Sequence, residues 1–244
     1  MKQYKDRFDL LTILLVAFVC MGFISCSDDD DNNSSANKEK TDSELILGTW
    51  NFTSDNGNIS ITFFDNGTYA HFDYKYFDDY SGFYRLTNDS IIFTIVQSKN
   101  ISYNRSVGIK ELSDNSLVFE GYDSQRISSG IIYNGVYRGT REKNVDEKTA
   151  VKYRKDIIGD WKVTYDLYGT MTSTLRINDN GTFVFYDEKP SDGYNGTYSI
   201  CDDKLLFVED SQKCPIGGLY KIKELTDNRF VLTDMYEDEI TGYK

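Results

Sequence analysis

The sequence predicts an all-β protein built from two tandem, eight-stranded, up-and-down antiparallel β-barrels. Aromatic residues make up 15% of the 244 residues, with 19 Tyr and 15 Phe but only 2 Pro, a composition that favours sheets over helices. Apolar and polar residues alternate with a period of two, as in half-buried strands. An internal repeat indicates that one kind of domain occurs twice.

The repeat consists of four short matches that recur in the same order. The matched segments are LGTW (47–50) with IGDW (158–161), DNGT (65–68) with DNGT (179–182), GFY (82–84) with GTY (196–198), and IKELSDNSLVF (109–119) with IKELTDNRFVL (222–232). The offsets lie between 111 and 114 residues, so only small insertions separate the copies. We therefore expect one domain over 44–142 and a second over 156–244. The charged segment between them, 143–155, either forms a short helix or runs as a linker.

The first copy contains eight apolar-rich segments separated by the turn sequences DNG, DDYSG, TND and SDN. The expected strands are 46–54, 58–64, 68–77, 82–87, 90–97, 102–112, 116–123 and 131–141. Short antiparallel strands with tight connections fit an up-and-down barrel, which leaves no sheet edge open to aggregation. A two-sheet sandwich is the alternative.

The start of each copy resembles the lipocalin-like domains of bacterial lipoproteins. Gly48 and Trp50, like Gly159 and Trp161, open a strand that is followed by a second strand, a DNG turn and a strand with the pattern G-x-Y. The resemblance implies that each tryptophan closes one end of its barrel, often against an arginine from the last strand.

The resemblance differs between the two copies at their last strands. In the first copy, either Arg138 or Arg141 is the expected partner of Trp50. The second copy has no late arginine, and its last strand, expected over 239–243, is short. The sequence therefore leaves open whether the second barrel closes completely.

The first 25 residues have the pattern of a secretion signal. Three basic residues, Lys2, Lys5 and Arg7, precede an apolar run over 10–24. That run is shorter than the roughly 20 residues that a membrane-spanning helix needs, so we expect a cleaved signal peptide over 1–25. A permanent transmembrane anchor is the weaker alternative.

The segment after the apolar run predicts a lipid anchor. FISC (23–26) resembles the bacterial lipobox, in which a small residue precedes the cysteine that is lipidated, here Cys26. SDDDD (27–31) resembles the sorting signal of Bacteroidetes-type surface lipoproteins. We therefore expect acylation of Cys26, a flexible acidic tether over 26–43, and display on the outer membrane facing the cell exterior. An ordinary signal peptide cut elsewhere is the alternative.

Charge and motif content exclude several functions. A net charge of −12 and a pI near 4.6 argue against binding of nucleic acid, whose phosphates require a basic face. The chain has one His and lacks the HExxH, G-x-S-x-G, Walker and CxxC motifs. We therefore expect no enzyme activity, no cofactor and no metal site.

Two cysteines remain in the second copy, Cys201 and Cys214. An oxidising compartment favours a disulfide between them. The extended residues that separate them span roughly 20 Å, whereas a disulfide needs Cα atoms within about 7 Å. The sequence leaves the pairing open.

The DNG turn at 65–67 decides which side chains face the interior of the first barrel. A two-residue loop would pair Phe64 with Tyr69, whereas a three-residue loop with Gly67 in the left-handed conformation pairs Phe63 with Tyr69. We predict the three-residue loop, because the same loop in the second copy turns Arg176 outward. The residues that then face the two interiors are Ile61, Phe63, Tyr69 and His71, and Leu175, Ile177, Phe183 and Phe185.

The candidate ligand-binding residues are Tyr69 and His71 in the first barrel and Phe183 and Phe185 in the second. His71 is either a core histidine with a satisfied hydrogen bond or a polar group in an aromatic ligand cavity. The leading interpretation is a non-catalytic surface lipoprotein that binds a small hydrophobic or amphipathic ligand. The alternative is a structural or adhesive module whose loops contact glycan or protein. The expected partners are thus the membrane, through the lipid anchor, and a small-molecule or glycan ligand.

Overall fold

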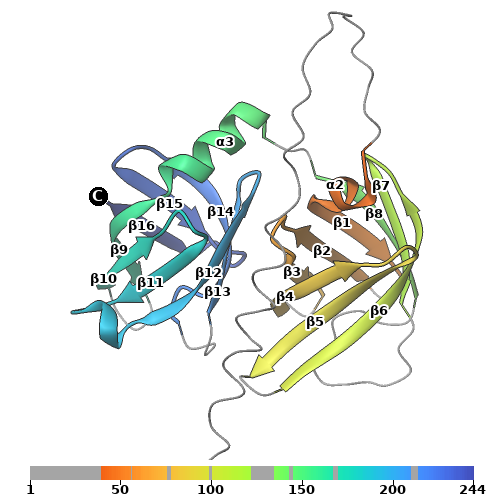
Figure 1. Cartoon of the computed structure of the whole chain (residues 1–244), viewed down its shortest axis with the longest axis horizontal. Coiled ribbons are helices and arrows are strands. Elements are labelled where there is room, and N and C mark those ends of the chain that lie inside the picture. The colour runs from red at the N-terminus through yellow and green to blue at the C-terminus, as the bar shows by residue number, and fades with distance from the viewer. Residues whose placement is uncertain are drawn as a thin grey trace, which may run out of the picture. The chain divides into compact units, whose positions relative to one another are not determined.

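The computed structural model describes residues 40–55, 57–75, 78–98, 101–121, 135–142, 145–166, 170–209 and 214–244. Residues 40–244 form one compact unit that contains two closed antiparallel barrels (Figure 1). The predicted fold class is therefore confirmed. The predicted signal peptide, Cys26 and most of the predicted tether lie outside the described residues.

Barrel 1 has the expected up-and-down order, and its last strand pairs with its first. Its strands are β1 (Gly48–Ser54), β2 (Gly57–Phe63), β3 (Thr68–Asp73), β4 (Asp78–Leu86), β5 (Ser90–Ser98), β6 (Ile101–Leu112), β7 (Ser116–Gly121) and β8 (Gly135–Arg141). The single strand expected over 68–77 is shorter, because the Asp73 carboxylate accepts a hydrogen bond from the backbone N–H of Lys75 and begins a turn. The turn expected at DDYSG (78–82) is wrong, because this segment pairs with β3 and forms the first half of β4.

Barrel 2 repeats this order and is also closed. Its strands are β9 (Gly159–Asp166), β10 (Thr170–Ile177), β11 (Thr182–Tyr186), β12 (Tyr194–Cys201), β13 (Lys204–Glu209), β14 (Gly218–Leu225), β15 (Arg229–Thr233) and β16 (Glu239–Tyr243), with a short 3₁₀ turn, η1 (Pro190–Asp192), before β12. Although β16 has only five residues, it pairs with both β15 and β9. The doubt about closure of the second barrel is thus resolved in favour of a complete barrel.

A short helix precedes the first strand of each barrel. Helix α2 (Asp42–Ile46) starts at a capping box formed by Thr41 and Glu44, so the end of the predicted tether is helical. Helix α3 (Glu147–Asp156) is capped by the Asp146 side chain, which accepts a hydrogen bond from Thr149. From Glu147 onward, the charged segment between the domains therefore forms a helix.

The DNG turns have the predicted three-residue geometry. Gly67 and Gly181 have φ angles of 78° and 80°, in the left-handed region that suits glycine. Phe63 pairs with Tyr69, as predicted, and the second copy has the same register. The predicted interior residues of both barrels are accordingly buried.

Each barrel has its own core, and large rings fill space left by glycines on neighbouring strands. A Cβ atom on Gly139 would lie 2.4 Å from the Phe52 ring, and one on Gly242 would lie 2.3 Å from the Phe230 ring. Aromatic pairs continue these cores, including Phe119 stacked on Tyr137 in barrel 1 at 5.1 Å and Trp161 against Phe230 in barrel 2 at 4.9 Å. Both interiors are therefore densely aromatic.

Among the described residues, no helix combines the length and the apolar character needed to cross a membrane.

Candidate functional site

One end of each barrel is closed by the barrel's single tryptophan. The Trp50 indole N–H donates to the backbone oxygen of Ile46 at 2.8 Å, and the Trp161 indole N–H donates to that of Ile157 at 2.7 Å. Both indoles are fully buried. Each tryptophan thus ties the segment that precedes its barrel to the first strand.

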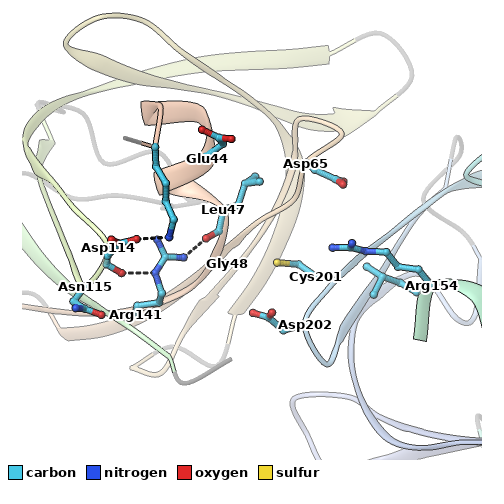
Figure 2. A pocket seen from close by; sticks show the side chains of 12 residues that line it. Glu44, Leu47, Gly48, Asp65, Asp114, Asn115, Arg141, Arg154, Cys201 and Asp202 are labelled. Atoms are coloured by element: carbon cyan, nitrogen blue, oxygen red, sulfur yellow. Dashed lines mark hydrogen bonds and ion pairs between the residues drawn. The ribbon is translucent and has the colours of Figure 1, made fainter. Parts of the chain in front are cut away.

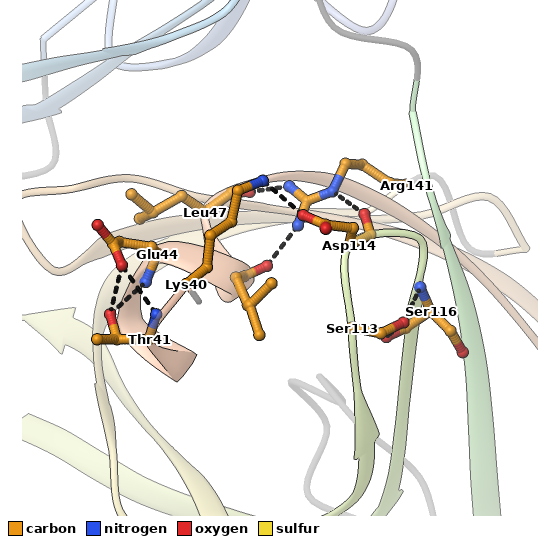
Figure 3. Close-up of polar contacts among 9 residues, drawn as sticks. Lys40, Thr41, Glu44, Leu47, Ser113, Asp114, Ser116 and Arg141 are labelled. Carbon is orange, nitrogen blue, oxygen red and sulfur yellow. Dashed lines mark hydrogen bonds and ion pairs between the residues drawn. The ribbon is translucent and has the colours of Figure 1, made fainter. Parts of the chain in front are cut away.

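Arg141 is the partner of Trp50 in barrel 1. Its guanidinium carbon lies 4.3 Å from the centre of the Trp50 ring, within the range of a cation–π contact. The guanidinium also donates to the backbone oxygens of Leu45, Leu47 and Asp114 (Figure 3). Arg138 pairs with Thr53 across β8 and β1 and is exposed. The structure therefore decides between the two arginines.

Lys244 has the corresponding position in barrel 2. Its ammonium nitrogen lies 4.3 Å from the centre of the Trp161 ring and donates to the backbone oxygen of Asp156 at 3.1 Å. The sequence reasoning missed this residue because it searched for an arginine. A basic residue at the end of the last strand would have been the useful signal.

Two buried side chains on β3, Tyr69 and His71, face the interior of barrel 1. Tyr69 is 0% exposed and lies 4.8 Å from the Phe93 ring, and His71 is 1% exposed and lies 6.0 Å from the Tyr80 ring. The Tyr69 hydroxyl and both ring nitrogens of His71 have no hydrogen-bond partner among the described residues. The expectation of a histidine with a satisfied hydrogen bond therefore does not fit this structure.

Burial keeps both groups neutral. It lowers the pKa of His71 to about 3 and raises the pKa of Tyr69. At neutral pH the imidazole therefore has one N–H donor and one acceptor nitrogen, and the phenol has a donor and an acceptor on one oxygen. Buried polar groups in proteins are nearly always hydrogen-bonded, so this pair requires a partner.

Barrel 2 differs at the same two positions. Its counterparts are Phe183, which lies 5.0 Å from the Phe207 ring, and Phe185, which lies 5.6 Å from the Tyr165 ring. Thr233 on β15 carries the one buried side-chain polar atom without a partner in the described part of this barrel. The four predicted ligand-binding residues thus lie in two separate interiors, and they do not form one site.

Polar groups next to Phe185 are satisfied within the chain. The Ser173 hydroxyl donates to the Asp187 carboxylate at 2.5 Å and lies 3.3 Å from the Tyr165 hydroxyl. Barrel 2 therefore also contains polar side chains near Phe185, but these side chains bond to one another. Only barrel 1 presents a pair of neighbouring unpartnered groups in the part of the chain that the structure describes.

The two cysteines of the second copy are free thiols. Cys201 packs against a cluster that contains Phe64 and Leu206, whereas Cys214 packs against the core of barrel 2. Burial raises the pKa of each thiol to about 12, so both are protonated at neutral pH. The disulfide that the sequence left open is not formed.

The two barrels contact each other through apolar residues on their outer faces. Phe64 and Leu206 are 0% exposed and Ala70 is 3% exposed in this seam. The Asn66 amide donates to the Ser199 hydroxyl at 2.5 Å, and the Lys204 ammonium lies 3.2 Å from the Glu142 carboxylate.

The sequence reasoning missed this seam. The pairs Phe63–Phe64 and Leu205–Leu206 each interrupt the period of two, so one member of each pair must face outward. That interruption was the available signal.

A pocket of about 370 Å³ lies at the seam beside the Trp50 end of barrel 1 (Figure 2). Arg154 points into it from α3 toward Cys201, and Arg141 lines the opposite side. Burial and the neighbouring Asp203 raise the pKa of Asp202, which also lines the pocket. The lining of the pocket includes both acidic and basic side chains. These side chains are not arranged as a nucleophile with a neighbouring base. In the described part of the chain, no three His, Cys, Asp or Glu side chains are grouped to hold a metal ion.

No protein-family model matches the chain, and no curated protein matches it.

Proposed function

We propose that this protein is a non-catalytic binding module whose ligand site is the interior of barrel 1. The observation that carries the proposal is the pair of unpartnered polar side chains, Tyr69 and His71, at positions where barrel 2 has Phe183 and Phe185. Aromatic walls with a few convergent polar groups are typical of small-molecule sites. Barrel 2, whose corresponding positions are apolar, supports barrel 1 across the seam.

The proposed ligand is a small, uncharged amphipathic molecule. A charged group would lose its hydration inside an aromatic barrel, and neither the neutral imidazole nor the neutral phenol would compensate for that loss. A hydroxyl or amide on an otherwise apolar molecule would supply the hydrogen-bond donor and acceptor that these residues lack. The Trp50 end is occupied by the indole and α2, so the ligand enters from the opposite end of the barrel.

We also propose that Cys26 carries a lipid anchor and that the barrels are displayed on the outer surface of the outer membrane. The lipobox-like FISC and the aspartate run after it support this location. Replacement of Cys26 by Ser tests the anchor by metabolic labelling with a fatty acid. Labelled wild-type protein and an unlabelled variant would support it, whereas label that persists in the variant would contradict it.

A second candidate function is adhesion through the surface. Tyr74 and Tyr236 are 47% and 51% exposed, and their rings lie 4.9 Å and 6.3 Å from the Phe72 ring. Exposed aromatic rings near the seam are suited to stacking on sugar rings. This observation supports the structural or adhesive alternative, in which loops contact glycan.

Thermal unfolding of the soluble chain from Ser27 onward, with libraries of lipids, metabolites and glycans, distinguishes the two functions. A ligand present at 100 times its Kd should raise the Tm by roughly 5 °C or more, because it binds only the folded state. The double variant Tyr69→Phe, His71→Phe gives barrel 1 the residues of barrel 2 and should abolish that shift. The matched control, Tyr74→Ala with Tyr236→Ala, should leave it unchanged. Loss of the shift in the surface variant but not in the interior variant would favour surface binding. A shift that neither variant affects would contradict both sites.

A further inference from the structure

The seam between the barrels is head-to-tail, because the two copies contribute different faces to it. Barrel 1 contributes its β2–β3 hairpin, through residues that we call the hairpin surface: Phe64, Asn66, Thr68 and Ala70. Barrel 2 contributes the outer face of β12–β14, through residues that we call the wall surface: Ser199, Leu206, Val208 and Leu219.

Because both barrels have the same fold, each also carries the counterpart of the surface that its partner uses. Barrel 2 has an unused hairpin surface, and barrel 1 has an unused wall surface. Head-to-tail contacts between identical units extend into open chains unless something stops them. The residues at the two unused surfaces therefore decide whether further copies can be added.

Three of the four positions on the unused wall surface of barrel 1 carry a more polar residue than the used one. The repeat offset aligns Arg85 with Ser199, Thr94 with Val208, and Ser106 with Leu219, while Ile92 aligns with Leu206. The alignment is structurally sound, because Tyr84 and Tyr198, one residue before Arg85 and Ser199, make the same hydrogen bond in their barrels. Ser199 receives the Asn66 amide, whereas Arg85 would place a cation there.

The unused hairpin surface of barrel 2 lacks the central apolar anchor. Asn178 stands where barrel 1 has Phe64, which is fully buried in the seam. The Asn178 amide instead donates to the Thr182 hydroxyl at 2.9 Å within its own hairpin. A polar amide at this position would lose its hydration in an apolar seam without the burial that Phe64 provides.

We infer that these substitutions restrict the head-to-tail contact to the single one inside the chain. Arg85 blocks the free wall surface and Asn178 blocks the free hairpin surface, so the protein stays a monomer of two barrels instead of joining further copies of itself. This inference is independent of the proposed ligand site, because it concerns only the outer faces of the barrels.

Two variants of the soluble chain from Ser27 onward test the inference. The wall variant carries Arg85→Ser, Thr94→Val and Ser106→Leu, and the hairpin variant carries Asn178→Phe. The wall variant has a restored wall surface, but its own hairpin surface stays blocked by Asn178. The hairpin variant has a restored hairpin surface, but its wall surface stays blocked by Arg85. Each variant alone should therefore be monomeric by size-exclusion chromatography with light scattering. An equimolar mixture should give a complex of twice the monomer mass. All four substitutions in one chain should give oligomers that grow with concentration.

Two results would overturn the inference. One is a mixture that stays monomeric although both variants keep the far-ultraviolet circular dichroism and tryptophan fluorescence of the wild type. The other is concentration-dependent association of the wild type in size-exclusion chromatography with light scattering, because the inference requires both of its free surfaces to be blocked. If either variant misfolds, Arg85→Ser mixed with Asn178→Leu repeats the test with smaller changes, since both positions lie outside the two cores.

Discussion

The ammonium group of Lys244 lies over the Trp161 ring at 4.3 Å, the same distance at which the guanidinium of Arg141 lies over Trp50. Both cations also donate to a backbone oxygen of the helix that precedes their barrel. The two copies therefore close their ends by the same contact with different residues. A cation at the end of the last strand, Arg141 in β8 or Lys244 directly after β16, contacts both the helix and the first strand of its barrel.

Lys244→Ala should destabilise barrel 2. Loss of a partly exposed cation–π contact costs about 0.5–1 kcal/mol, and the Asp156 backbone oxygen loses a donor. Urea unfolding followed by tryptophan fluorescence, in a Trp50→Phe background so that Trp161 alone reports, measures the change. Lys244→Arg is the matched control and should unfold like the parent. Equal midpoints for Lys244→Ala and the parent would show that the contact contributes nothing.

His71→Phe should change how stability depends on pH. Burial lowers the folded-state pKa of His71 from 6.5 to about 3, so between these values the unfolded state binds a proton that the folded state does not. The stability contributed by the neutral ring is complete above pH 6.5 and is lost as pH falls toward 3. Between pH 8 and pH 5 the free energy of unfolding of the wild type should therefore fall by about 2 kcal/mol more than that of His71→Phe.

Urea unfolding at pH 8 and at pH 5 measures this difference. The carboxylates titrate in both proteins, so their contributions cancel in the comparison. An identical pH dependence in the two proteins would mean that the folded state protonates His71 as readily as the unfolded state.

Leu206→Asp should destabilise the seam strongly. Leu206 is fully buried between the barrels, so the variant loses its apolar burial and places a carboxylate in an apolar cluster, at a cost of roughly 3 kcal/mol or more. Ile92→Asp is the matched control, because Ile92 is the counterpart of Leu206 in barrel 1 and remains partly exposed. Denaturant unfolding should show a much smaller loss for that variant. Equal losses of unfolding free energy in the two variants would indicate that burial in the seam does not cause the destabilisation by Leu206→Asp.

Gly242→Ala should cost more than Gly181→Ala. A Cβ atom on Gly242 would lie 2.3 Å from the buried Phe230 ring, and moving that ring in a packed core costs about 3 kcal/mol. A Cβ atom on Gly181 meets nothing within 4 Å, so that variant pays only for a left-handed backbone at φ +80°, about 1 kcal/mol. Thermal or urea unfolding of both variants checks the order. The reverse order would show that barrel 2 relaxes around the added methyl group.

The sequence by itself determined the features that depend on local chemistry. The alternation of apolar residues located most strands of barrel 1 to within a few residues. The exceptions are the segment 68–77, which contains both β3 and a turn, and DDYSG (78–82), which belongs to β4 and not to a turn. The DNG sequence determined the loop, because glycine adopts the left-handed conformation that a three-residue hairpin needs, and the loop set the register that buries Tyr69 and His71.

The candidate site was predicted in part. The period of two placed Tyr69 and His71 inside barrel 1, but it could not show that their polar atoms lack partners. That result depends on side chains from several strands that are distant in the chain. For the same reason the sequence did not distinguish the satisfied Ser173–Asp187 pair of barrel 2 from an open polar site.

Only the tertiary structure decided which residues meet across the barrel ends and between the barrels. The choice of Arg141 over Arg138, the contact of Lys244 with Trp161, and the burial of Phe64 against Leu206 all join segments far apart in the sequence. Periodicity records whether a side chain faces inward or outward, because it reflects the geometry of a single strand. It carries no information on what an outward-facing residue touches, because that partner is set by the packing of the two closed barrels against each other.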